Sequence, residues 1–522
     1  MKKVDPVMTF PQRPFKLLAT SAAAILMVGC ASLNPEALSE QEIQAKSQSD
    51  LQKRMAEVAP ISGAITLEEA IARALKYNLD HRAKSLEMAL ASGQLEAGKY
   101  DMLPRLLANA GYFSRDSDLV RRSQDVNGNT YDNKYISSER NHATQDLTLS
   151  WSMLDFGASY YSAKQNGDRL LIATERRRKS MHTLIQNVRT TYWRALAAQT
   201  LSQRVSVAIT EAEAALKDSR GMQAAKVRSP GESLRFQRTL LDNLRQLEAL
   251  QRELGTAKVE LASLIGAAPG SVLALTEPTD AEPQALGMSL QAMEAQALTQ
   301  NADLREAHYN VRIAANDTRK AILKLMPGIS FDYGKRRDDD RFLVDQHWQE
   351  ASMRVSLNLF NLLSAPSQKR AAEAAESVMQ ARRMALQMAV FTQVHLSWHQ
   401  YDDAVRQYQR AHAIADVDNQ LAQIAGGQEQ SQMAGRLDRI SADVISILSS
   451  ARRYQSMARV QEALSRVQST LGMEPTVGSL DELDLPTLQK TMDQSLKNWN
   501  RQMQVKPAPQ ARVRRSLTES LA

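Results

Sequence analysis

Four short segments of the chain alternate between apolar and polar residues with a period of two, the pattern of a β-strand with one apolar face. They lie at about residues 105–114, 145–154, 328–335 and 352–360. The other face carries charged and hydroxyl groups, among them Asp146, Asp332 and Arg354. A half-buried sheet in a soluble protein would alternate in the same way, but the rest of the sequence has no pattern for a core that would cover the apolar face. We therefore expect two strand hairpins whose apolar face is covered by lipid.

Long helical patterns follow the two hairpins. Residues 158–226 contain no proline, and the corresponding residues 364–432 contain only Pro366, near the start, where a helix tolerates it. At 1.5 Å per residue each stretch would form a helix roughly 100 Å long. Apolar residues at alternating steps of three and four residues have the spacing of a coiled coil, as in Leu247, Leu250, Leu254, Ala257, Leu261 and Leu264. The sequence predicts long helices with shorter helices packed against them.

The two halves of the chain repeat one pattern. Residues 67–111 match residues 290–334 at an offset of 223, and farther along the offset becomes 206. The difference of 17 residues places one insertion in the first half, between Gly111 and Ser150. We predict a duplicated helix–hairpin–helix unit, with a first repeat at 65–269 and a second at 289–472.

The N-terminus has the pattern of an export signal. Four basic residues, Lys2, Lys3, Arg13 and Lys16, precede an apolar run that ends at Val28. Its length is typical of a signal peptide and too short for a transmembrane helix. We predict a signal peptide at 1–29, and Gly29-Cys30 is similar to a bacterial lipobox. Cys30 would carry a covalent lipid, with acyl chains such as palmitate, followed by a linker at 30–64; the alternative is an ordinary signal with an incidental cysteine. Ala31, where lipoproteins retained in the inner membrane carry Asp, favours the outer membrane.

Amino-acid composition favours one fold class and excludes several kinds of functional site. Of the 522 residues, 43% are hydrophobic and only 5% aromatic, which favours a mainly helical protein. The 65 Lys and Arg residues exceed the 58 Asp and Glu residues by a net charge of +7, but they are spread along the helices, and the pattern does not favour nucleic-acid binding. The single cysteine excludes a disulfide scaffold and a cysteine-rich zinc site within this chain.

Membrane crossing must be made by the strands, because no apolar run after the signal is long enough for a transmembrane helix. Strands cross a bilayer only as a closed barrel, and bacterial barrels have about eight or more strands. Four strands per chain cannot close. We therefore expect oligomerisation, in which two copies would give eight strands and three copies twelve.

Motifs for catalysis are weak. His395 and His399 are four residues apart, but Leu396, Ser397 and Trp398 stand between them, so the Glu of the H-E-x-x-H zinc motif is missing. We find neither a glycine-rich phosphate loop after a strand nor a serine elbow. The sequence predicts a protein that is not an enzyme and has no metal or cofactor besides the lipid on Cys30.

The chain resembles the TolC family of outer-membrane efflux and secretion channels. The resemblance rests on Thr66-Leu67-Glu68-Glu69-Ala70 in the opening helix, Leu103-Pro104 before the first strand, residues 149–157 after the second, and the second half from Ser289 to Gly472. It implies a homotrimer with a twelve-stranded barrel in the outer membrane of a Gram-negative bacterium and an α-barrel in the periplasm. It also implies efflux or type I secretion with a periplasmic adaptor and an inner-membrane transporter of the ABC or RND class.

Two questions stay open at this stage. The Gly-Pro-Asp-Tyr motif that often follows the cysteine in channels of RND pumps is missing between Ala31 and Gly63, so the pump class is undetermined. The opposing class is a lipid-anchored periplasmic coiled-coil scaffold or adaptor without a pore. We assign residues 270–288 and 473–522 to a belt around the helices, with the last residues as a disordered tail.

Helix-breaking residues mark two turns where the long helices reverse, and the resemblance implies that these turns meet the adaptor. The residues concerned are Arg228, Ser229, Pro230 and Gly231 in the first half and Gly435, Arg436 and Leu437 in the second. The helix after the second turn would constrict the tunnel, with Asp438, Ser441, Asp443 and Val444 as the candidate gate. Asp438 can equally be an acid that stabilises a helix N-terminus.

Overall fold

The computed structural model describes residues 37–225, 229–268, 270–278, 282–431, 435–474 and 483–504. The chain divides into two compact units, Met1–Pro60 and Ile61–Ala522. In the first unit the described part forms helix α2 (Glu40–Glu57), which begins with a capping box between Ser39 and Glu42. The predicted signal peptide and Cys30 lie outside the described residues. All the elements below belong to the second unit.

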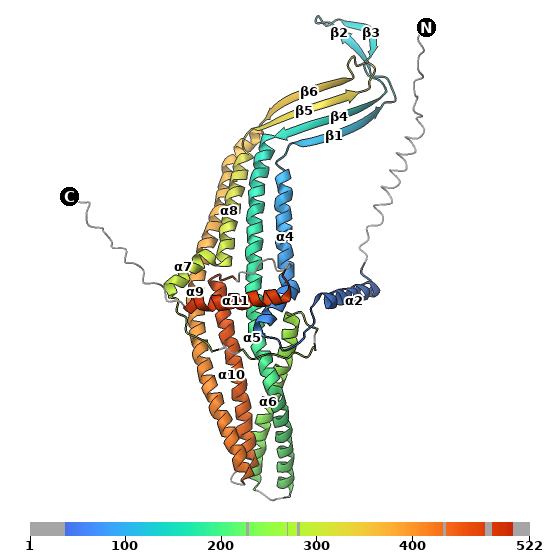
Figure 1. Ribbon diagram of the computed structural model, residues 1–522. Helices are drawn as coiled ribbons and strands as arrows, with labels where there is room; N and C mark the ends of the chain where they lie inside the picture. Colours follow the sequence, from blue (N-terminus) through green and yellow to red (C-terminus); the bar gives the residue numbers. More distant parts are fainter. Residues whose placement is uncertain are drawn as a thin grey trace, which may run out of the picture. The chain divides into compact units, whose positions relative to one another are not determined.

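The helices come in two matched sets (Figure 1). The first set is α3 (Leu67–Tyr77), α4 (Leu79–Tyr100), α5 (Met153–Ala224) and α6 (Pro230–Leu264), with 11, 22, 72 and 35 residues. The second set, with the same four lengths, is α7 (Leu290–Gln300), α8 (Ala302–Leu323), α9 (Leu359–Gln430) and α10 (Arg436–Thr470). The offsets of 223 and 206 carry each helix onto its counterpart, so the fold has the duplication that the sequence predicts.

Local chemistry explains where these helices begin and end. Asn78 and Asn301, which correspond in the two halves, each end one helix and cap the next by accepting a hydrogen bond from the backbone of the residue three positions on. Gly266 and Gly472 follow α6 and α10 with φ of +77° and +64°. Because only glycine adopts this left-handed conformation without strain, both repeats end at an equivalent glycine cap.

The four expected strands form one antiparallel sheet in the order β1-β4-β5-β6 (Figure 1). They are β1 (Arg105–Ser114), β4 (Asn141–Ser152), β5 (Gly328–Asp338) and β6 (His347–Ser356). Each half contributes one hairpin, and the two hairpins join through β4 and β5. Every strand connects to the helices at the same end of the sheet, while the loops inside the hairpins lie at the other end.

Three strands have other bounds than predicted, and one loop contains an unpredicted hairpin; the third strand ends at Asp338 and not at 335. The fourth strand is His347–Ser356 and not 352–360, because Asn358 caps α9 and the alternating residues beyond it belong to that helix. The second strand is Asn141–Ser152 and not 145–154, since Ser152 caps α5. The polar loop between the first and second predicted strands contains an extra hairpin. Its strands are β2 (Val120–Gln124) and β3 (Thr130–Ile136), and they occupy the predicted insertion.

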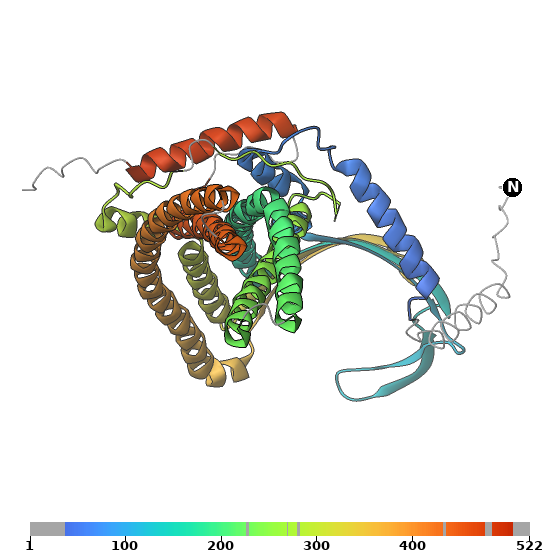
Figure 2. The same cartoon turned by 90° about the horizontal axis from the view of Figure 1, so that it is seen from below.

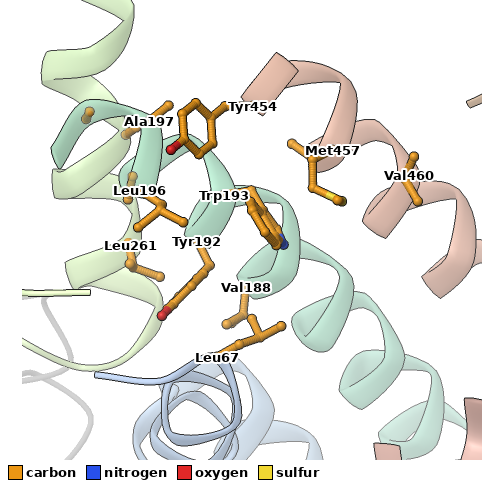
Figure 3. Close-up of a cluster of buried hydrophobic side chains, with 14 of the residues drawn as sticks. Leu67, Val188, Tyr192, Trp193, Leu196, Ala197, Leu261, Tyr454, Met457 and Val460 are labelled. Atoms are coloured by element: carbon orange, nitrogen blue, oxygen red, sulfur yellow. The ribbon is translucent and has the colours of Figure 1, made fainter. Parts of the chain in front are cut away.

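The hydrophobic core follows α5, which packs against α4, α6, α8 and α10. At its centre the buried Tyr192 hydroxyl donates to the backbone, with oxygen distances of 2.8 Å to Ile65 and 2.6 Å to Thr276 (Figure 3). Ile65 also pairs with Leu275. Helix α11 (Leu485–Gln504) packs on α3 beside the long helices (Figure 2). The segment around Leu275 and helix α11 belong to residues 270–288 and 473–522, which are assigned to the belt from the sequence.

None of the helices described is both long and apolar enough to cross a bilayer.

Candidate functional site

The second unit has two open edges. Strand β1 follows α4 at one end of the sheet order, and β6 leads into α9 at the other end. Helix α9 contacts α7, α8 and α10, whereas α6 packs mainly on α5. Large apolar side chains are exposed along the α9 edge, at Val378, Met384, Met388, Leu396, Ile414, Val417, Leu421 and Ile424. The opposite edge exposes Leu79, Leu86 and Leu90 of α4 and Leu234, Leu241 and Val259 of α6.

The sheet has two chemically different faces. Strand register places Leu106, Leu149 and Tyr333 side by side, and Trp151, Phe331 and Met353 form the next row. We call this side the apolar face. Most of its members are exposed, with Leu106 at 65% and Met353 at 66% of their full surface, and Trp151 is half-buried. The apolar surface continues beyond the sheet into the first turns of α9, where Leu359, Phe360 and Leu363 are exposed.

Some polar and charged side chains on the opposite, polar face pair with one another. The side-chain amide of Asn109 donates to the carboxylate of Asp146 at 2.8 Å. Arg336 and Glu350, on β5 and β6, form an ion pair at 3.2 Å. This face also holds Asp332 beside Ser150, as the register shows. A sheet with apolar residues on one side and charged and polar residues on the other has the chemistry of a wall between lipid and water.

The helix ends farthest from the sheet lie at two places, where α5 is followed by α6 and where α9 is followed by α10 (Figure 1). At the first, Ser229 caps α6 by accepting from the backbone of Glu232 at 3.3 Å, and Pro230 occupies the first helical turn. Arg228 lies outside the described residues. At the second, Asp438 accepts from the backbone N–H of Gly435 at 3.3 Å. Pro230 and Gly435 therefore stand at the starts of α6 and α10, and the carboxylate of Asp438 caps α10.

Arg439 connects three helices close to these turns. Its guanidinium lies 2.9 Å from Glu211 of α5, 2.5 Å from Glu429 of α9 and 2.9 Å from Asp443 of α10. We call these four residues the Arg439 cluster. One cation serves three carboxylates, so the cluster has an excess of two negative charges when all are ionised. Burial raises the pKa of Asp443 above its ordinary value, although Arg439 acts to lower it.

The other candidate gate and turn residues have different surroundings. Val444 is 1% exposed and packs in the hydrophobic core, so it cannot line an opening, and we remove it from the gate. Ser441 is half-buried. Arg436 pairs with Asp218 of α5 at 3.1 Å, and Leu437 packs against the core. Asp443 is the one predicted gate residue that the fold brings into the Arg439 cluster.

Sequence reasoning missed three members of the cluster. Arg439 lies one helical turn before Asp443, which is a visible signal for an ion pair. Glu211 and Glu429 come from other helices, and nothing local in the sequence indicates that they meet Arg439. His395, considered as a metal ligand, instead lies 2.7 Å from Glu294. Within the described ranges, no group of three or more His, Cys, Asp or Glu side chains could hold a metal ion.

Solved structures with the same fold are outer-membrane channels. The outer-membrane channel OprN matches with a TM-score of 0.59 and 15% identity over 78% of this chain and 89% of its own. CmeC from Campylobacter jejuni matches with 0.59 and 13% over 82% and 89%, and the open state of MtrE from Neisseria gonorrhoeae with 0.58 and 16% over 78% and 88%. No protein-family model and no curated protein sequence matches the chain. The resemblance found in the sequence is thus confirmed for the architecture: this chain has the fold of the TolC-type outer-membrane channels.

Proposed function

We propose that the protein is a trimeric channel of the outer membrane that continues as a helical tunnel into the periplasm. The observation that carries this proposal is the contact between the two repeats inside one chain. There, α5 packs on α8 and α10, and β4 pairs with β5. Replacing each element by its counterpart in the other repeat gives contacts of α9 with α4 and α6, and of β6 with β1. These are the elements of the two open edges.

The same contact therefore repeats between copies. The exposed apolar residues of α9 would pack against those of α4 and α6 in the next copy, and β6 would pair with β1. A head-to-tail contact of this kind closes into a ring. Closure also removes the unpaired backbone groups of edge strands, which in lipid would each cost several kcal/mol. Three copies give twelve strands, enough for a water-filled barrel, whereas eight strands leave an interior that side chains fill.

The exposed apolar face disfavours the alternative of a lipid-anchored scaffold or adaptor without a pore. Such a protein would stay in water with Leu106, Phe331 and Met353 uncovered, and large exposed apolar patches of this kind mark contact surfaces. Extraction separates the two functions. The channel needs detergent at every step, whereas a scaffold is released as a soluble protein when its lipid anchor is removed.

The repeat also predicts the contact between copies residue by residue. Leu149 pairs with Tyr333 inside the chain, and the two offsets carry this pair onto Val355 and Ala110. We expect Ala110→Cys with Val355→Cys to cross-link neighbouring copies by oxidation, giving bands up to three chains. Ala110→Cys with Arg354→Cys is the control, because position 354 lies on the polar face. A ladder that ends at two chains, or equal cross-linking of the control, would reject the trimer.

At the far end we propose that the two turns bind a periplasmic adaptor, which links the channel to an inner-membrane transporter. Gly231 and Gly435 have room for side chains: nothing lies within 4 Å of a Cβ at Gly231, and the nearest atom at Gly435 is an Asp438 oxygen at 3.6 Å. We therefore expect Gly231→Trp with Gly435→Trp to keep the trimer and its conductance but to block export. Normal export in cells that carry this double variant would exclude docking at the turns.

We further propose that Cys30 carries the lipid anchor and that Asp443 contributes to an acidic constriction. Three copies would bring three Arg439 clusters, each with its excess of negative charge, around one axis. Such a ring favours cations over anions. Export through the channel needs no catalytic group of this chain, in agreement with a protein that is not an enzyme.

A further inference from the structure

Two rows of the apolar face near the hairpin loops are not apolar. Register places Lys335 beside Leu147 and Gln349, and places Arg337 beside Gln145 and His347. Both rows begin on β1 with small residues, Ala108 and Ala110. They directly follow the row of Leu149 and Tyr333. The face therefore changes from apolar to cationic within one residue pair, roughly 7 Å along the strands.

A hollow of about 780 Å³ lies over these two rows. Its lining includes all eight of their residues, namely Ala108, Leu147, Lys335, Gln349, Ala110, Gln145, Arg337 and His347. From the polar face only the intervening row of Asn109 contributes, and the polar rows on either side of it do not. Two of the three rows that line the hollow therefore belong to the apolar face, with the small side chains of β1 at one side.

Lys335 and Arg337 have no counter-ion of their own in this hollow: the carboxylate in its lining, Asp146, belongs to the row of the polar face and accepts from Asn109. Among the described residues, Lys335 and Arg337 form no ion pair and no side-chain hydrogen bond. Arg336, between them on the polar face, pairs with Glu350. Both side chains in the hollow are exposed, and the groups next to them are amides and an imidazole, which can also donate hydrogen bonds. A compact group with negative charge fits this set of donors.

We propose that the hollow binds the phosphate of a lipid headgroup in the leaflet that faces the exterior. This inference rests on the proposed function, in which the apolar face contacts lipid. The acyl chains would lie on Leu149, Tyr333 and Phe331, and the phosphate would lie between Lys335 and Arg337. The two cations stand two residues apart on one strand, so both can reach one phosphate. Phosphate contacts with ammonium and guanidinium groups are charge-assisted and strong.

The test compares two lipids on the full-length trimer purified in detergent. Native mass spectrometry would count bound lipid A, which carries two phosphates, and dephosphorylated lipid A. We expect Lys335→Gln with Arg337→Gln to weaken binding of the phosphorylated lipid by about tenfold or more. Lys134→Gln with Arg122→Gln is the matched control, since it removes one Lys and one Arg from the β2–β3 hairpin, and it should bind as wild type does.

Three results would overturn the inference: equal binding of the two lipids by the wild-type trimer, equal binding by both double variants, or displacement of lipid by inorganic phosphate at similar concentration. The first and third need only the wild-type protein, so they decide even if a variant fails to assemble. Conductance of the same preparations separates the two proposals. A conducting trimer that binds the phosphorylated and the dephosphorylated lipid equally rejects only this inference. Protein that forms no conducting oligomer rejects the proposed function.

Discussion

Replacing Arg439 by glutamine should loosen the helical ends near the turns. The substitution removes the cation that lies 2.9 Å from Glu211, 2.5 Å from Glu429 and 2.9 Å from Asp443. Glutamine keeps a polar side chain but satisfies at most one of these carboxylates. The three helices α5, α9 and α10 then lose their common ionic contact, and three negative charges remain close together.

The expected loss of local stability in Arg439→Gln can be worked out from the exposure of the charged side chains and the distances between charges. The Arg439 side chain is 19% exposed, and the exposed fractions of Glu211, Glu429 and Asp443 are 36%, 31% and 35%, so solvent screens each pair. Partly exposed ion pairs contribute about 0.2–1 kcal/mol each. Two like charges about 4 Å apart repel by about 1 kcal/mol at the dielectric constant of water, and by less at larger separations. Together these terms predict a local loss of about 2–3 kcal/mol, or ~30- to 150-fold in the equilibrium for opening.

Hydrogen exchange measures this local stability. Amides in the first turns of α10 and the last turns of α5 and α9 should exchange ~30- to 150-fold faster in Arg439→Gln, while amides around Tyr192 keep their rates. Arg453→Gln is the control on the same helix, because Arg453 has one ion pair, with Glu277 at 3.6 Å. It should leave exchange at the turns unchanged.

The difference in exchange rate between wild type and Arg439→Gln should become smaller at low pH. The folded-state pKa of Asp443 is raised by burial, so the proton binds more tightly in the folded state. The stability linked to that proton is present at low pH and is lost as the pH rises through the folded pKa. Lowering the pH from 7 toward about 4 therefore removes charge from the cluster and relieves the repulsion. Equal exchange in wild type and Arg439→Gln at pH 7, or a difference that does not fall in acid, would refute the role of the cluster.

Two further substitutions test the sheet and the glycine cap. Trp151→Arg, on the apolar face, should lower the stability of the proposed membrane-inserted trimer by about 2–4 kcal/mol if it lies near mid-membrane, whereas Ser150→Arg, on the polar face, should be tolerated. Similar losses in refolding yield from both variants would contradict the assignment of the faces. Gly472→Ala should lower the free energy of unfolding by about 3 kcal/mol or more, because its Cβ would clash with the backbone oxygen of Gln300 at a residue with φ of +64°. Gly255→Ala, inside α6 with open space around it, should stabilise slightly in the same thermal denaturation, and equal midpoints would contradict the clash.

The sequence allows a good prediction of the elements because they depend on local patterns. Period-two alternation located all four strands of the main sheet, and the internal offsets predicted that the two halves would have equal helices. The errors concern ends and insertions. Asn358 starts a helix inside an alternating run, since its side chain accepts from the backbone of Phe360, and alternation alone does not reveal such a cap. The β2–β3 hairpin is short and polar, so it has little of the apolar pattern on which strand prediction depends.

The functional residues were less predictable because they depend on contacts between distant segments. Asp443 was selected from its position after a turn, but its partners Glu211 and Glu429 are far away in the sequence. Lys335 and Arg337 look like ordinary surface charges until the register places them on the same face as Leu147. Val444 was selected for the gate from the same segment after the second turn, yet its apolar side chain faces the core.

The duplication gives two helices of equal length that differ in how many of their residues are buried. This difference in burial indicates a missing neighbour of one of them. Helices α5 and α9 both have 72 residues, but 25 residues of α5 are buried and only 8 of α9. Helix α5 lies between its own repeat and the second one, whereas α9 lies at an edge with apolar residues exposed. If the two repeats are alike, α9 needs the neighbours that α5 already has. A single chain cannot provide them, because its remaining edge belongs to α4 and α6 on the far side of the first repeat. A neighbouring copy of the chain can provide these contacts. Each added copy then presents the same free edge until the proposed ring closes.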